Sequence, residues 1–108
     1  MLRASLEKAG GQVNLRPIAT GTGTTGVHNG REIIEFTDAV VLRDTHEFPQ
    51  ARAALETAAG SNVADRAALV AGNFSMMNRS LDAIGAPIGN GGLATATALG
   101  VEIPSHLL

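Results

Sequence analysis

The chain has 108 residues, which is enough for one domain. Its 8 Lys and Arg against 10 Asp and Glu give a formal net charge of −2, so we expect no basic face and no binding of nucleic acid. It contains no cysteine, which excludes disulfides, thiolate–metal sites and cysteine-based redox or nucleophilic chemistry. It also has no 18-residue apolar run and no basic leader followed by an apolar segment, so we expect no membrane association and a cytoplasmic location.

The first 30 residues form a segment distinct from the rest. Residues 2–9 can make two helical turns that end at Gly10 and Gly11. Residues 12–30 are rich in Gly and Thr and carry few apolar anchors, so we expect an arm without regular structure of its own that packs on another surface.

Three glycines in this arm, Gly21, Gly23 and Gly26, have the G-x-G-x-x-G spacing of dinucleotide-binding loops. That motif needs an apolar strand before it and a helix that opens inside it. Pro17 interrupts the preceding run, and the next helical pattern begins only near Arg31. We therefore interpret the motif as a Gly/Thr-rich loop, and we expect no bound cofactor.

Two amphipathic helices are expected next. Over residues 31–42 one face is apolar, and the other carries Arg31 and Glu35, whose spacing of four suits a surface ion pair. A polar turn over residues 43–47 precedes a second helix, which begins near Pro49 and ends at Gly60.

The longest helix is predicted over residues 63–84. Its apolar residues recur at intervals of four and three, which indicates one buried stripe, and Gly85 with Pro87 supplies the stop. Ser61 and Asn62 lie where an N-cap belongs. The stripe consists of Val63, Ala67, Val70, Phe74, Met77, Leu81 and Ile84.

The remaining chain predicts a flexible turn at residues 89–92, a short helix over residues 93–99 and an extended apolar tail over residues 101–108. The fold class is therefore all-α, a small bundle of about four helices around one long helix, with residues 31–108 as the helical domain. With 3 Phe and no Tyr or Trp the core is thin. We expect a homo-oligomer, because association would add buried area.

The three histidines lie in separate loops or in the tail. His28 belongs to the arm, His46 to the turn before the second amphipathic helix, and His106 to the tail. None has the helical spacing of a metal-binding pair, so we expect no metal site. His46 with Asp44 and Glu47 offers a small acid–base cluster, while a merely hydrated polar turn is the simpler interpretation.

Polar residues also border the long helix near its end. Arg79 and its neighbours Asn78 and Asp82 lie close to the apolar stripe, so Arg79 needs a carboxylate or carbonyl partner at a helix or subunit boundary. A structural role is the main interpretation, and a pocket-lining role is the alternative.

Residues 32–88 resemble the C-terminal half of the carboxymuconolactone decarboxylase and alkylhydroperoxidase D-like family. The most specific part of the likeness is the pattern N-R-x-x-D-A-x-G-x-P, which ends the long helix. It is carried by Asn78, Arg79, Asp82, Ala83, Gly85 and Pro87. The resemblance implies an all-helical, oligomeric protein.

The same resemblance limits the chemistry. The peroxidase branch of the family uses a Cys-x-x-Cys pair that this chain does not have, so that route is excluded, whereas the decarboxylase branch does not need the pair. Two hypotheses follow. The chain is a non-redox or half-length relative that binds a small organic ligand, such as an organic acid, or it is an enzyme acting on a carboxylated or lactone substrate. In the second case His28, His46 and Arg79 are the candidate catalytic residues, brought together between subunits.

Overall fold

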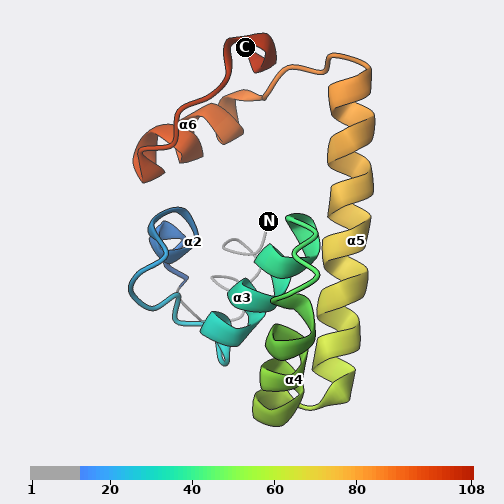
Figure 1. The fold of residues 1–108 in the computed structure, drawn as a ribbon. Coiled ribbons are helices and arrows are strands. Elements are labelled where there is room, and N and C mark those ends of the chain that lie inside the picture. Colours follow the sequence, from blue (N-terminus) through green and yellow to red (C-terminus); the bar gives the residue numbers. More distant parts are fainter. Residues whose placement is uncertain (1–12) are drawn as a thin grey trace.

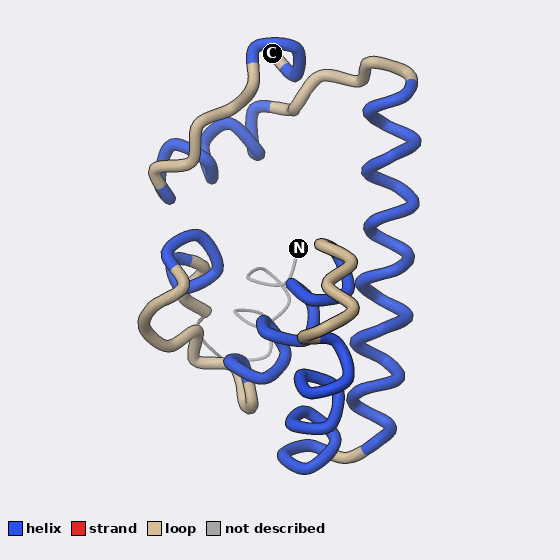
Figure 2. The backbone as a smooth tube through the Cα atoms, viewed as in Figure 1, coloured by secondary structure: helices blue, strands red, loops and turns tan. Residues whose placement is uncertain are grey.

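The computed structural model describes residues 13–108, and this part of the chain is helical without any strand (Figures 1 and 2). The predicted all-α class is confirmed. The helix expected over residues 2–9 lies outside the described residues. The elements are α2 (Arg16–Thr20), α3 (Gly30–Val41), α4 (Phe48–Ala59), α5 (Ser61–Ala83), α6 (Asn90–Leu99) and the single 3₁₀ turn η1 (Ser105–Leu107).

Helices α3, α4 and α5 pack pairwise into a small bundle (Figure 1). Pro49 lies in the first turn of α4, where its missing N–H costs nothing, and Gly60 ends α4 with φ of 93°. Because Gly60 is the single residue between α4 and α5, the two helices run antiparallel side by side (Figure 1). At 1.5 Å per residue, α5 is about 35 Å long and extends well beyond its two neighbours.

The core of the bundle is small. Phe36 on α3, Leu55 on α4 and Ala64 on α5 are each fully buried and form one cluster. The ring of Phe48 lies against that of Phe36 with centroids 5.7 Å apart, an ordinary aromatic pair distance. Phe36 and Leu55 are the two large side chains buried completely in the described part of the chain, so the bundle excludes little apolar area from water.

The buried face of α5 differs from the predicted one. Ala64 and Ala71 are buried, and Ala67 and Ala68 pack against the core, which is the i, i+3, i+4, i+7 pattern of one helix face. The expected stripe is mostly exposed, with Val70 at 57% and Phe74 at 46%. The prediction of a buried stripe was wrong because alanine lets α3 and α4 approach α5 more closely than the larger side chains would.

A polar clamp joins α4 to α5 at the surface of the bundle. The Arg52 guanidinium donates to Asp65 at 2.6 Å and lies 2.9 Å from Glu56 on its own helix. The hydrogen bond to Asp65 raises the pKa of Arg52 further above its ordinary value, at which the guanidinium is already charged. Since these groups are solvated, the clamp adds little to the free energy of unfolding, and its main effect is on the orientation of α4 relative to α5.

Two loop predictions were also wrong. The arm does contain regular structure, because Pro17 in the first turn and Gly21 in the left-handed region at the end delimit α2. Residues 90–92, expected as a flexible turn, form the first turn of α6. The predicted cap at Ser61 and Asn62 was wrong too, since both residues lie inside α5 and Gly60 precedes them.

Helix α6 and the tail lie apart from the bundle, and α6 runs back from the end of α5 towards α2 (Figure 1). The tail folds back onto the segment that precedes α6, where the Ile88 amide donates a hydrogen bond to the Leu107 carbonyl at 2.7 Å. Arg16 on α2 donates to the Ala98 carbonyl on α6 at 3.3 Å. Among the described helices, none has the length and apolar character that crossing a membrane requires.

The core cluster predicts a large effect of Leu55→Ala. This substitution should lower the free energy of unfolding by about 3 kcal/mol, because it leaves a cavity against Phe36 and Ala64. Leu69→Ala, at a residue 73% exposed, should change it by less than about 0.5 kcal/mol. Urea denaturation followed by circular dichroism checks both values, and equal effects would contradict this description of the core.

Candidate functional site

The arm is held against α3 by a short set of contacts. The Asn14 amide donates to the Thr25 carbonyl at 2.8 Å and closes the segment into a loop. Thr25 is buried, and its hydroxyl accepts a hydrogen bond from the Val27 amide at 3.1 Å. Gly30 begins α3 directly over Thr25, where a side chain at residue 30 would come within 2.3 Å of the Thr25 hydroxyl oxygen. The missing side chain of Gly30 therefore lets the loop lie against the helix.

This close approach leaves an open hollow between the loop and α3, which we call the arm pocket. Its volume is about 1020 Å³. It carries two cationic or protonatable side chains, His28 and Arg31, together with three carboxylates and several loop hydroxyls. The lining residues are Pro17, Gly21, Thr22, Gly23, Thr24, Thr25, Gly26, Val27, His28, Asn29, Gly30, Arg31, Glu32, Ile34, Glu35 and Asp38.

A smaller apolar groove of about 180 Å³ lies next to the arm pocket, under the beginning of the arm. The two hollows share Thr25, Val27, Gly30, Ile34 and Asp38, so they adjoin one another. Aliphatic side chains dominate the groove. These are Val13, Leu15, Ile18, Val27, Ile33 and Ile34. Together the hollows offer polar groups on one side and hydrocarbon on the other, as binding sites for small organic molecules do.

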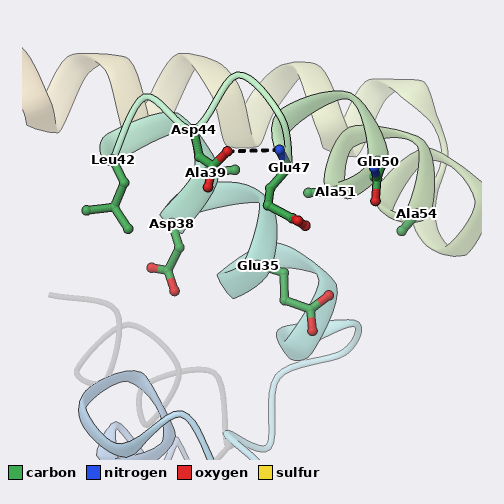
Figure 3. A pocket seen from close by; sticks show the side chains of 9 residues that line it. All are labelled: Glu35, Asp38, Ala39, Leu42, Asp44, Glu47, Gln50, Ala51 and Ala54. Carbon is green, nitrogen blue, oxygen red and sulfur yellow. Dashed lines mark hydrogen bonds between the residues drawn. The ribbon is translucent and has the colours of Figure 1, made fainter.

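A third hollow, the acidic pocket, lies between α3, the following turn and α4 (Figure 3). Its volume is about 490 Å³, and four carboxylates line it, two from α3 and two from the turn. They belong to Glu35, Asp38, Asp44 and Glu47, beside Leu42, Gln50 and three alanines. This concentration of negative charge disfavours an organic anion there, because like charges repel at short range.

One of these carboxylates has a structural role. An Asp44 carboxyl oxygen accepts hydrogen bonds from the backbone amides of His46 at 3.1 Å and Glu47 at 3.0 Å (Figure 3 shows the second). These amides precede α4, so the Asp44 side chain stabilises the turn that leads into the helix. The proposed acid–base cluster of His46, Asp44 and Glu47 is thus a hydrogen-bonded turn in which the carboxylate of Asp44 is already used.

The three candidate catalytic residues lie on three different elements. His28 lines the arm pocket, His46 lies in the turn before α4, and Arg79 lies on the projecting end of α5. All three are exposed. Neither His46 nor Arg79 contributes to the three hollows described above, so within one chain the described residues do not assemble these side chains into a common pocket.

Metal binding has no evident site in residues 13–108. No group of three or more His, Asp or Glu side chains lies close enough together there to hold an ion. Comparison of the chain with protein-family models, with curated proteins and with solved structures gives no match.

The sequence pointed to His28 but not to its neighbour in the pocket. Arg31 was assigned to a solvated helix face, and it does pair with Glu35 at 3.1 Å. It also lines the arm pocket from the first turn of α3. The position of Arg31 directly after the Gly/Thr-rich loop was the available signal, because such a residue lies where the loop meets the helix.

The close approach of Gly30 to Thr25 predicts that replacing this helical glycine by alanine lowers the stability of the protein. Gly72→Ala, in the open middle of α5, should stabilise the protein by up to about 1 kcal/mol through helix propensity. Gly30→Ala should instead destabilise it by about 2 kcal/mol, because the new methyl group meets the Thr25 hydroxyl. Thermal denaturation of both variants measures the difference.

The Thr25→Ala background supplies the control for this pair. Removing the hydroxyl should make Gly30→Ala much less harmful, since the closest atom is gone. A cost that stays the same in both backgrounds would show that the arm does not lie against α3 in this way.

Proposed function

We propose that this chain is a non-redox or half-length relative of the carboxymuconolactone decarboxylase-like family and works in the cytoplasm as a homo-oligomeric helical protein that binds a small organic ligand. The arm pocket is the observation that carries this proposal. The pocket has a volume of about 1020 Å³ and adjoins an apolar groove, which leaves room for a small organic molecule.

Charges of both signs line the arm pocket, so it suits a ligand that carries an acidic group beside hydrogen-bond donors, with the acidic group at Arg31 and away from the three carboxylates. Arg31 and His28 lie at the start of α3, where the helix dipole also favours negative charge. The carboxylates of Glu32, Glu35 and Asp38 accept hydrogen bonds from hydroxyl or amine groups. A small hydroxylated organic acid with a hydrocarbon portion matches this set, whereas a simple anion has no hydrogen-bond donors to offer the carboxylates.

Association into an oligomer is supported by the small core. Phe36 and Leu55 are the large side chains fully buried in the described residues, while Leu42, Leu69 and Ile84 are each more than 70% exposed. Where exposed apolar side chains adjoin one another, as those along the projecting half of α5 do, they are typical of surfaces that another subunit covers. The resemblance to an oligomeric family points in the same direction.

An enzyme acting on a carboxylated or lactone substrate is the second candidate. The exposure of His28, His46 and Arg79 on three separate elements favours it, because exposed groups on different elements can meet across a subunit boundary. A histidine would act as the general base or acid, and Arg79 would bind the carboxylate.

Ligand binding predicts a selective effect of Arg31→Gln. Small hydroxylated organic acids, screened by isothermal titration calorimetry, should include binders whose affinity falls at least about tenfold in this variant, because a charge-assisted hydrogen bond is lost. Arg66→Gln is the matched control, since it removes the same charge from an exposed site on α5. Equal affinity of wild type and Arg31→Gln for every binder would contradict the proposal.

The enzyme hypothesis predicts turnover as well as binding. Lactone opening or decarboxylation of the best binders, followed by proton nuclear magnetic resonance, should depend on protein concentration and fall at least about a hundredfold in His46→Ala. Binding through Arg31 without any turnover would favour the binding protein. Turnover unaffected by His28→Ala, His46→Ala and Arg79→Gln would exclude the catalytic residues named here.

A further inference from the structure

The projecting half of α5 carries a row of large apolar side chains that the described residues leave uncovered. We call this row the α5 seam. Beyond Ala71 no residue of α5 is buried, because α5 extends past α3 and α4 (Figure 1). The seam consists of Val70 (57% exposed), Phe74 (46%), Met77 (46%), Leu81 (47%) and Ile84 (78%).

The spacing of the α5 seam is that of a coiled coil. Its members follow one another at intervals of four and three residues, a mean of 3.5, and the pattern extends back through Ala67 to Val63. A strict repeat of 3.5 keeps one narrow seam facing a partner helix, whereas a helix on a globular core shows a broader apolar face. The seam therefore fits a second helix with the same repeat.

The residues that flank the seam are uncharged. In a coiled coil the positions beside the seam set the choice of partner through their charges. In the projecting half of α5 these positions hold Ala71, Asn73, Asn78 and Ser80. The two charged residues there, Arg79 and Asp82, occupy positions away from the seam. Two identical seams can thus meet without like-charge repulsion, and no flanking charge selects a different protein.

We propose that the α5 seam pairs with the α5 seam of a second copy of this chain, in antiparallel orientation. This deepens the oligomer proposed above and rests on it. The exposed seam presents several hundred Å² of apolar surface, a large share of the roughly 800 Å² that each partner contributes to a standard interface. A two-fold interface needs one self-complementary patch, and the seam is such a patch.

The position of the bundle decides the orientation. Helices α3 and α4 pack on the first half of α5 (Figure 1), so a parallel pair would bring two whole bundles together at the same end. An antiparallel pair that overlaps through the projecting halves places the bundles at opposite ends. In that register Phe74 packs against Met77 of the other copy, and Leu81 packs against Val70 of the other copy.

Two adjacent methionines provide the test. Met77 belongs to the seam, while Met76 is 62% exposed and lies outside it. Met77→Glu should raise the dimer dissociation constant more than about a hundredfold, because each copy would bury an unpaired carboxylate. Met76→Glu adds the same charge one residue away and should leave the constant within about threefold of wild type. Sedimentation equilibrium gives the constants, and circular dichroism confirms that both variants are folded.

Three outcomes of this experiment would overturn the proposal. The first is a wild-type chain that stays monomeric at high micromolar concentration. The second is a dimer unaffected by Met77→Glu, which would place the interface elsewhere. The third is an equal loss in Met76→Glu and Met77→Glu, which would indicate a broad apolar contact with no coiled-coil seam.

Orientation is measured separately. The natural chain has no cysteine, so Ser61→Cys creates a single site for a spin label at the exposed start of α5. Antiparallel pairing should separate the two labels by roughly 40 Å, and parallel pairing would hold them within roughly 20 Å. Pulsed electron paramagnetic resonance distinguishes these distances, and the shorter label-to-label distance would overturn the antiparallel arrangement.

Dimerisation through the α5 seam and ligand binding in the arm pocket can be measured separately. Calorimetry with the hydroxylated acids is repeated on Met77→Glu, whose substituted residue lies far along the chain from Arg31. Organic acid binding by a monomeric wild type would refute the seam and support the arm pocket. A dimer that Met77→Glu dissociates, but that binds none of the acids, would support the seam and refute ligand binding.

Discussion

Close contact between the alanines of α5 and the two large core residues is the constraint on which the rest of the structure depends. Ala64, Ala67, Ala68 and Ala71 let α3 and α4 approach α5, and Phe36 and Leu55 fill the space between them. Alanine contributes little apolar area, so this contact determines how α3 and α4 lie on α5 but adds only modestly to the free energy of unfolding. The larger apolar residues of α5 remain outside the core and are available for another contact.

The limits of α4 and the end of α5 followed from local chemistry, and the buried face of α5 did not. Pro49, Gly60 and Gly85 limit the helices because proline and glycine act through the backbone at their own positions. The face of α5 is decided by tertiary contact. An alanine stripe and a stripe of larger residues both run along this helix, and side-chain size favoured the wrong one as the core. Which stripe is buried depends on how closely the neighbours approach.

The candidate site was predictable only in part for a related reason. His28 lies in a loop whose glycines and threonines marked it as unusual. The pocket itself depends on α2 folding beside that loop and on Thr25 fitting beneath Gly30, a contact between residues five apart whose geometry no periodic pattern encodes. Arg31 looked like half of a surface ion pair because its pairing with Glu35 is real, and an exposed pair does not reveal what else the side chain faces.

The arm pocket and the α5 seam lie on different helices, and this separation limits how strongly they influence each other. The pocket is built on the first turns of α3, whereas the seam begins where α5 leaves the bundle. Coupling between two sites requires an element with two arrangements that both sites bias. In the described residues α3 contacts α5 through the core cluster that contains Phe36 and Ala64, and close-packed cores of this kind deform little. A ligand in the pocket would therefore add to the stability of each subunit without changing how subunits pair.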